Sequence, residues 1–421
     1  MDLKPSAASS ETAGTGRGPN TIEVDSAYIH IPFCVRRCGY CNFTVIAGRD
    51  DLAPAVTRAI VHEIEGWPEA AAVTLAPRGL RTVFFGGGTP SRLPPKHLGE
   101  ILDAIRRVAN VDPAAEITLE VNPEDVTAES VRRWIELGFT RFSLGVQSFR
   151  AEKLRFLDRG HTAADATKAV TMLSAAGGNV SVDLIFAAGN ETLAQWRDDL
   201  SVATRLPVVH LSTYGLTIEK GSAFYGKLHR DDLPTVSHDV EADMFDATLE
   251  DLDAAGFEHY EISNHARPGH RCRHNIRYWT GRPWLAAGPG AASFLPPQRE
   301  VRHRSVTRYL AKHRERGSLI AESETLSSQT MCDEAIAFGL RMLDGVAIDE
   351  LAKRRSVDAR PYTRICKMFV DEGLLERVSD RELGLAQSKQ KEFFPATYRL
   401  SPRGIRLADV VSDRFLHLGA D

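Results

Sequence analysis

Short hydrophobic runs alternate with longer amphipathic segments along most of the chain. From Ala27 onward, runs rich in β-branched and aromatic residues are separated by segments whose apolar residues recur every three or four positions. We expect strands at residues 27–31, 81–87, 116–121, 141–146, 180–186 and 208–216. Helices are predicted between them at residues 52–66, 95–109, 124–137, 151–157, 163–176 and 191–205. This alternation predicts an α/β fold whose parallel sheet curves into an incomplete (β/α)6 barrel.

The regions outside the barrel have a different character. Residues 1–25 are rich in Ser, Ala, Gly and Thr and are predicted to form a disordered arm, so the barrel spans residues 26–217. Residues 218–324 form an extension, for which we expect a helix, one more strand and a tight glycine loop, at 237–256, 258–263 and 288–293. Residues 325–421 read as a mainly helical, winged-helix-like domain with helices at 335–344, 348–354 and 359–373 and a following hairpin.

Composition and charge narrow the class of protein. The chain has 421 residues, 43% of them hydrophobic, which is enough for a large core and two or three domains. Its net charge of -4 gives no general attraction to nucleic acid or to an anionic membrane, and the C-terminal domain lacks a dense basic helix. The basic run at 302–316 is predicted to be a solvated helix face, and contact with acidic groups of a ligand or with an acidic partner surface is the alternative. Neither a membrane span nor a signal peptide is evident, so a cytoplasmic location is expected.

Three of the six cysteines are crowded into one short segment. Cys34, Cys38 and Cys41 have CxxxCxxC spacing. Zinc usually takes four ligands from separated pairs or from cysteines together with histidines. Three thiolates from one loop instead suit three irons of a four-iron, four-sulfur cluster, and they leave the fourth iron open. A zinc site with an outside ligand and a chance cluster of buried thiols remain as alternatives, and thiolates favour a reducing compartment.

Polar residues and glycines occur where the predicted strands end. In parallel barrels these ends meet at one mouth, where ligands bind. The candidates are Gly86–Thr89, Glu120 with Asn122, Gln147, Asp183 and Tyr214–Gly215. The glycines permit close approach of backbone amides to a ligand, although they could form a tight turn alone. Glu120 lies within an apolar strand, where an ionised carboxylate needs a cation or several donors, and Asp183 raises the same question.

The order of these motifs resembles a known family. The cysteine motif is followed by the sequences GGGTP, LEVNP, GVQS and VDLIF, an order similar to that of the radical S-adenosylmethionine superfamily. The sequences YIHIPFC, LDRGHT, YEISNHARPGH and CRHNIRYW resemble its branch of oxygen-independent coproporphyrinogen III oxidases and their heme-chaperone relatives. The resemblance covers roughly residues 27–410.

This resemblance implies cofactors and contacts. The three cysteines would hold a [4Fe-4S] cluster, whose open iron would take the amine and carboxylate of S-adenosyl-L-methionine. The residues implied to contact that cofactor are Tyr28, Tyr40, Gly88, Thr89, Glu120, Gln147, Arg159, Asp183, Gly215 and Ala292. Two departures lie nearby: residues 186–189 lack a proline common in relatives, and Ala292 replaces a histidine common in the chaperone branch.

Two further motifs favour the chaperone branch over the oxidase branch. Phe43 stands where the oxidases carry another cysteine, and His274–Trp279 reads HNxxYW. The resemblance implies that heme is bound, with His274 as the candidate iron ligand, and is passed to an acceptor protein of unknown identity. The sequence leaves room for a membrane-associated acceptor and for a homodimer, and no nucleic-acid partner is expected. On chemistry alone His274 could be a hydrogen-bonding residue in a loop, and the nearby Cys272 could be a ligand or a buried thiol. His259, His265 and His270 are also nearby, so chemistry alone does not make His274 the unique iron ligand. Oxidation of coproporphyrinogen III is the alternative function.

Overall fold

The computed structural model describes residues 22–69, 73–378, 396–416 and 418. Most of the predicted N-terminal arm therefore lies outside the described residues. Its last part does not match the prediction, because Ile22–Val24 forms strand β1 and pairs in parallel with β5 (Val73–Leu75). The apolar residues Ile22 and Val24 allow this pairing, and Val24 is fully buried.

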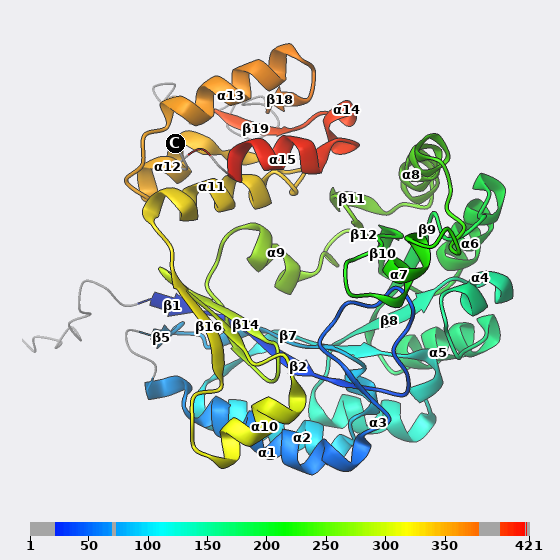
Figure 1. Cartoon of the computed structure of the whole chain (residues 1–421), viewed down its shortest axis with the longest axis vertical. Helices are drawn as coiled ribbons and strands as arrows, with labels where there is room; N and C mark the ends of the chain where they lie inside the picture. The colour runs from blue at the N-terminus through cyan, green and yellow to red at the C-terminus, as the bar shows by residue number, and fades with distance from the viewer. Residues whose placement is uncertain (1–21, 70–72, 379–395, 417, 419–421) are drawn as a thin grey trace, which may run out of the picture.

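A nine-stranded sheet forms the centre of the molecule (Figure 1). All six predicted barrel strands are present and lie side by side in chain order, each parallel to the next: β2 (Ser26–Ile31), β6 (Leu80–Gly87), β7 (Val111–Val121), β8 (Arg141–Gln147), β9 (Asn179–Phe186) and β10 (His210–Gly215). The predicted extra strand is also present, as β11 (Glu258–Glu261). The prediction did not include β12 (Asn264–Ala266) and β13 (Leu285–Ala287), which are too short to show a period. They extend the two edges of the sheet.

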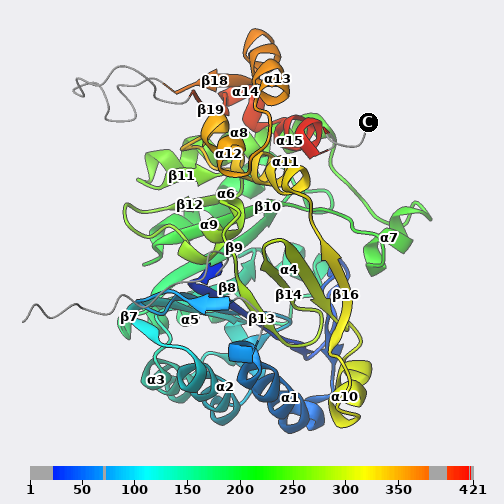
Figure 2. The ribbon, with the colours of Figure 1, turned by 90° about the vertical axis from the view of Figure 1, so that its left-hand side faces the viewer.

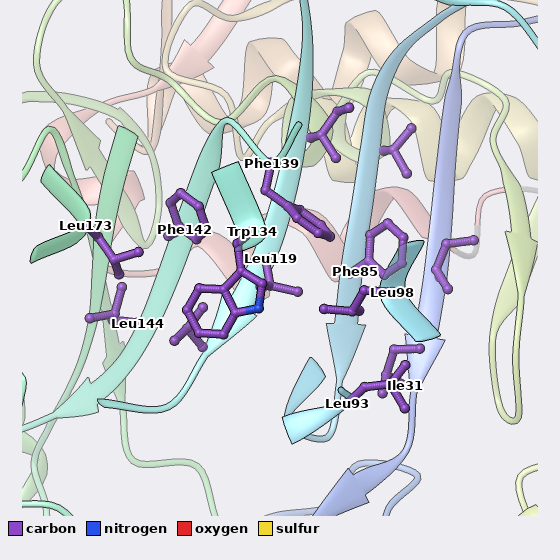
Figure 3. Packing of buried hydrophobic residues seen from close by; sticks show 14 of the residues in the cluster. Ile31, Phe85, Leu93, Leu98, Leu119, Trp134, Phe139, Phe142, Leu144 and Leu173 are labelled. Atoms are coloured by element: carbon purple, nitrogen blue, oxygen red, sulfur yellow. The ribbon is translucent and has the colours of Figure 1, made fainter. Parts of the chain in front are cut away.

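Helices cover the outer face of this sheet and bury its apolar side chains. They are α1 (Ala53–Glu65), α2 (Pro95–Val108), α3 (Ala128–Leu137), α4 (Ala151–Phe156), α5 (Ala163–Ala175) and α6 (Leu193–Arg205). Figure 3 shows the core between the two layers, where Phe85, Leu119 and Leu144 of the strands face Leu98 and Trp134 of the helices. The sheet is thus held rigidly from outside, and its other side is left to the remaining domains.

The start of α3 differs from the prediction. The helix predicted at 124–137 would begin directly after Asn122 and Pro123, but residues Pro123–Asp125 form a separate 3-10 turn, and Asn122 makes no capping hydrogen bond. The helix begins at Ala128, where Thr127 accepts from the backbone N–H of Ser130 and the Ser130 side chain bonds back to Thr127. This frees the Asn122 side chain for other contacts. The predicted end at Gly138 is confirmed, with a φ of 96°.

The extension crosses the top of the barrel before the C-terminal domain. It contains α7 (Ala223–Leu228), α8 (His238–Ala254), α9 (Arg273–Trp279) and a three-stranded antiparallel sheet of β14 (Ala292–Leu295), β15 (Gln298–Arg302) and β16 (Ile320–Thr325). Figure 2 shows α10 (Val306–Arg314) beside α1 and β16 leading towards the C-terminal domain. The basic run at 302–316 is not one solvated face, because the Arg302 side chain is buried and pairs with Glu63.

The C-terminal domain has its own hydrophobic core. Its elements are α11 (Ser328–Gly339), β17 (Val346–Ala347), α12 (Ile348–Arg354), α13 (Arg360–Asp371), β18 (Leu375–Arg377), β19 (Thr397–Leu400), α14 (Pro402–Ile405) and α15 (Ala408–Leu416). Three helices followed by a hairpin match the predicted winged-helix-like order, although α11 begins and ends earlier than predicted. Ile336, Tyr362, Phe369 and Phe415 lie in the core of this domain. Across the described ranges, no helix is long and apolar enough to cross a membrane.

Candidate functional site

A cavity of about 680 Å³ opens where the barrel strands end. We call it the strand-end cavity. It is lined by the three cysteines of the motif and by eight of the ten predicted cofactor contacts: Tyr40, Gly88, Thr89, Glu120, Gln147, Arg159, Asp183 and Gly215. Parallel strands thus bring together side chains from Cys34 to Gly215, which lie far apart in the sequence. The roles of these residues as ligands remain predictions.

The three cysteines of the motif all face the strand-end cavity. None of them forms a disulfide. The Sγ of Cys34 lies 3.6 Å from Oγ1 of Thr89, and Nη1 of Arg159 lies 3.8 Å from Sγ of Cys38. Burial raises the pKa of the Cys34 thiol to about 11, so metal binding would displace a proton from it. Within the described ranges, no three Cys, His, Asp or Glu side chains are grouped so that they could hold one metal ion. Each thiolate of a four-iron cluster bonds a different iron, so three separate thiols in one loop fit a cluster better than a single zinc ion.

Arg159 connects the cysteine loop to two strand ends. Its Nη2 donates to Oδ1 of Asn122 and to the carbonyl oxygen of Gly145, both at 2.7 Å. Its Nη1 reaches Cys38. A guanidinium in this place puts positive charge beside the thiols and could also bind a carboxylate of a ligand.

Two carboxyl groups face the cavity from neighbouring parts of the sheet. Oε2 of Glu120 accepts from the backbone N–H of Gly87 at 2.9 Å, and Asp183 accepts from the Ser143 hydroxyl at 3.2 Å. Burial, together with the nearby Asp183 carboxylate, raises the pKa of Glu120 to about 7. Burial also raises the pKa of Asp183. A cationic ligand would relieve both groups, which makes this wall suited to an ammonium or sulfonium ion.

The backbone N–H groups of the glycine run already have hydrogen-bond acceptors within the protein, although the run lines the strand-end cavity as expected. The N–H of Gly87 donates to Glu120, while those of Gly88 and Thr89 donate to the carbonyl oxygens of Ile31 and Phe33 at 2.8 and 2.7 Å. Gly87 has a φ of 114°, and a Cβ there would lie 2.4 Å from the His30 ring. Close packing therefore requires the glycine. What the run gives the cavity is a wall without side chains.

Gln147 adopts a left-handed backbone conformation with a φ of 66°. The next two residues are held by a buried carboxylate, since Asp199 accepts from the Ser148 hydroxyl at 2.6 Å and from the Phe149 N–H at 2.7 Å. Asp199 in turn pairs with the buried Lys153 at 3.2 Å. This buried network keeps Gln147 in a conformation that a free loop would rarely adopt.

A second cavity of about 530 Å³ adjoins the first. We call it the aromatic cavity. Its walls include six aromatic side chains and one arginine: Tyr28, Phe43, Tyr278, Trp279, Trp284, Phe338 and Arg304. Asn42, Phe43, Gly87 and Glu120 line both cavities. Two predicted cofactor contacts, Tyr28 and Ala292, line this cavity and not the strand-end cavity, so the ten predicted contacts are divided between two spaces.

His274 lies behind the wall of the aromatic cavity and does not line either space. It is 1% exposed. Its Nδ1 lies 2.9 Å from the Thr82 hydroxyl and its Nε2 lies 2.7 Å from the Tyr278 hydroxyl. Burial lowers the pKa of His274 to about 3, so the ring is neutral, as a metal ligand must be. An iron could reach Nε2 only after Tyr278 releases it.

The backbone of α9 is fixed by a carboxylate from the sheet. Oε2 of Glu116 accepts from the N–H of Arg273 at 3.1 Å, and Oε1 accepts from the N–H of His274 at 3.0 Å. Helix α9 is thereby anchored to β7, with Tyr278 and Trp279 at its far end facing the aromatic cavity. The sequence did not indicate Trp284 and Phe338 as wall residues, because they come from separate elements and share no motif. Arg304 belongs to the basic run at 302–316, for which contact with acidic ligand groups was the alternative.

A curved parallel sheet with a three-cysteine loop at its open mouth defines a class of metal-cofactor barrel proteins. Comparisons with known proteins identify the class. Residues 28–203 match the radical SAM superfamily, and residues 326–381 match the HemN C-terminal domain. The chain is 34% identical over 361 residues to the heme chaperone HemW of Synechocystis sp., covering 83% of this chain and 86% of that protein.

Two further relatives and one solved structure are also similar to this chain. HemW of Mycobacterium tuberculosis is 32% identical over 369 residues, covering 87% of this chain and 92% of that protein. The mitochondrial radical S-adenosyl methionine domain-containing protein 1 of Danio rerio is 32% identical, covering 76% and 73%. The fold is similar to that of coproporphyrinogen III oxidase (HemN) from Escherichia coli, with a TM-score of 0.77 at 19% identity over 95% of this chain and 91% of that chain. The chain belongs to the radical S-adenosylmethionine superfamily, in the family of the heme chaperone HemW.

Proposed function

We propose that this protein binds heme in the aromatic cavity and delivers it to an acceptor protein, with a [4Fe-4S] cluster and S-adenosyl-L-methionine in the strand-end cavity. The observation that carries the proposal is the aromatic cavity itself. Its volume of about 530 Å³ lies within the range of cofactor sites. The relatives named heme chaperones support heme as the ligand.

The walls of the aromatic cavity suit a flat, apolar ring with acidic side groups. Tyr278 and Trp284 pack edge to face with their centroids 4.6 Å apart, which presents flat surfaces on which a porphyrin can stack. Arg304 lines the same cavity and could pair with a propionate. Tyr278 and Trp279 belong to the HNxxYW motif of α9, so this motif would contribute the wall and, through His274, the candidate iron ligand.

The strand-end cavity would hold the other cofactors. Cys34, Cys38 and Cys41 would bind the cluster, and Arg159, Glu120 and Asp183 would meet the charged groups of S-adenosyl-L-methionine. Bound there, the cluster supplies an open iron and one-electron chemistry. The residues of this chain would orient the cofactor and compensate its charges.

The second candidate function is oxidative decarboxylation of coproporphyrinogen III. The fold similarity to HemN favours it. Phe43, in place of the further cysteine expected from the oxidase branch, disfavours it. The two functions make opposite predictions for the same purified protein.

The deciding experiment is anaerobic reconstitution with iron and sulfide, followed by heme titration and an assay with coproporphyrinogen III, S-adenosyl-L-methionine and a reductant. We expect one heme per chain and no protoporphyrinogen. Formation of protoporphyrinogen would favour the oxidase, and failure to bind heme would reject the chaperone. Bound zinc without sulfide would instead show that the three cysteines form a zinc site.

A further inference from the structure

Phe43 is a large apolar side chain that lies outside the hydrophobic cores of the protein. It is 67% exposed, and none of the described aromatic rings stacks on it. It lies two residues after Cys41 and lines both cavities. An exposed phenyl ring at the boundary of two ligand cavities is unfavourable in water and would gain from a flat partner on either side.

Hydrogen bonds hold the backbone on both sides of Phe43, whereas its ring is largely exposed. On one side, the N–H of Cys41 donates to the carbonyl oxygen of Cys38 at 3.1 Å. On the other side, the carbonyl oxygen of Thr44 is bonded to Nε2 of His30 at 2.7 Å. The ring therefore projects from a segment tied directly to the cysteine motif.

Phe43 also differs from the other residues that the two cavities share. Asn42 and Glu120 are polar, and Gly87 has no side chain. Among these shared residues, Phe43 is the one with an apolar surface on which a porphyrin edge can pack. Phe338, which is 40% exposed, faces the aromatic cavity alone and comes from α11 of the C-terminal domain.

We infer that Phe43 couples the two cavities, so that S-adenosyl-L-methionine and heme each strengthen the binding of the other. This inference rests on the proposed function. A ligand in the strand-end cavity confines the ring to the side facing the aromatic cavity, and heme confines it from the opposite side. Binding of the first ligand therefore includes the entropy cost of ordering the Phe43 ring, and the second ligand binds with a smaller entropy cost. The coupling must be equal in both directions.

The test measures both dissociation constants in the cluster-loaded protein, anaerobically and without reductant so that S-adenosyl-L-methionine stays intact. Soret absorbance gives the heme constant with and without S-adenosyl-L-methionine, and equilibrium dialysis gives the reverse. In the wild type we expect each ligand to tighten the other about fivefold to tenfold. In Phe43→Ala the ratio should fall to one, and Phe43→Trp should restore it.

Phe338→Ala is the matched control, because it removes an exposed aromatic ring from the aromatic cavity alone. It should weaken heme binding by the same factor with and without S-adenosyl-L-methionine, which leaves the coupling intact. Iron and sulfide contents are measured for each variant to confirm equal loading. A wild-type ratio of one or less, or an unchanged ratio in Phe43→Ala, overturns the inference while leaving heme binding itself intact. Absence of heme binding in the wild type rejects the proposed function instead.

Discussion

The two adjoining cavities are built in different ways. The strand-end cavity takes its residues from the ends of successive strands of one sheet, from the cysteine loop and from the loop that carries Arg159, and its walls carry thiols, carboxylates and a guanidinium. The aromatic cavity shares Gly87 and Glu120 of the sheet with it, but takes its other residues from β2, the cysteine loop, α9, the segment beyond it and α11, and six of its side chains are the aromatic rings named above. This difference indicates that one space is suited to a charged cofactor and the other to a flat apolar ligand. Substitutions in one cavity should therefore affect one ligand more than the other.

Removing the three cysteines should have the largest effect. In a variant with Cys34→Ala, Cys38→Ala and Cys41→Ala, we expect iron and sulfide to fall from about four each per chain to none, because no thiolates remain to bind the cluster. Binding of S-adenosyl-L-methionine should be lost as well. Heme binding should persist, because none of these cysteines lines the aromatic cavity. Metal analysis and heme titration measure the two outcomes.

Cys332→Ala is a suitable control for the triple variant, since Cys332 is fully buried in the core of the C-terminal domain. It should retain both ligands. If the triple variant loses heme binding while remaining folded, the two cavities do not act as separate sites.

Removing an aromatic ring from the aromatic cavity should weaken heme binding and leave the binding of S-adenosyl-L-methionine unchanged. Trp279→Ala takes away a wall of this cavity and about 2 kcal/mol of apolar contact, which corresponds to about thirtyfold weaker heme binding. The affinity for S-adenosyl-L-methionine should stay unchanged, because Trp279 does not line the strand-end cavity. Titration of both ligands provides the measurement, and weakening of both would contradict the assignment of heme to this cavity.

The candidate iron ligand can be tested with a pair of substitutions. If His274 binds iron, His274→Ala should weaken heme binding about tenfold or more and shift the Soret band. Tyr278→Phe keeps the ring on the cavity wall but frees Nε2 of His274, which now bonds to the Tyr278 hydroxyl at 2.7 Å. We therefore expect Tyr278→Phe to bind heme at least as tightly as the wild type. Unchanged heme spectra in His274→Ala would show that another group is the ligand.

A smaller effect should appear in the pH dependence of cofactor binding. The pKa of Glu120 is about 7 in the folded protein against an ordinary value of 4.5, so the carboxyl holds its proton up to near neutrality. A cationic cofactor needs the ionised form, and affinity for S-adenosyl-L-methionine should rise severalfold from pH 6 to pH 8. Glu120→Gln should bind more weakly at pH 8 and lose most of this dependence. An unchanged pH profile in Glu120→Gln would show that another group titrates.

The raised pKa of Glu120 should also make the stability of the folded protein depend on pH. Because the folded state holds the proton more tightly than the unfolded chain does, the contribution of Glu120 favours folding most at low pH and is lost as pH rises from about 4.5 to about 7. In ligand-free protein, Glu120→Gln should therefore gain free energy of unfolding relative to the wild type above pH 7. Denaturant titrations at pH 5 and pH 8 would measure this difference.

The sequence predicted the strand-end cavity well for a physical reason. Each strand is a hydrophobic run of regular length, and parallel strands end on one edge of the sheet, so residues such as Glu120 and Asp183 could be assigned to one mouth from the pattern alone. The six strands and the order of the C-terminal elements followed from the same periodicity and from turn residues. The sequence did not show which oxygen atoms accept from the N–H groups of the glycine run, because these acceptors come from other parts of the chain.

The aromatic cavity could not be predicted in the same way. Trp284 and Arg304 come from the extension and Phe338 from the C-terminal domain, so they meet only through the tertiary fold, which no local sequence pattern shows. For the same reason, the sequence could not show that Tyr28 and Ala292 line the aromatic cavity, whereas the other predicted contacts line the strand-end cavity. His274 was recognised from its motif, but its hydrogen bonds to Thr82 and Tyr278 depend on how α9 packs against β6.

The central claim is that the two cavities hold different ligands at the same time. The most direct measurement is a heme titration of the cluster-loaded protein saturated with labelled S-adenosyl-L-methionine, with the retained label counted at each step. We predict binding of one heme per chain with the label fully retained. Release of one S-adenosyl-L-methionine for each heme bound would contradict the claim and show that both ligands occupy one site.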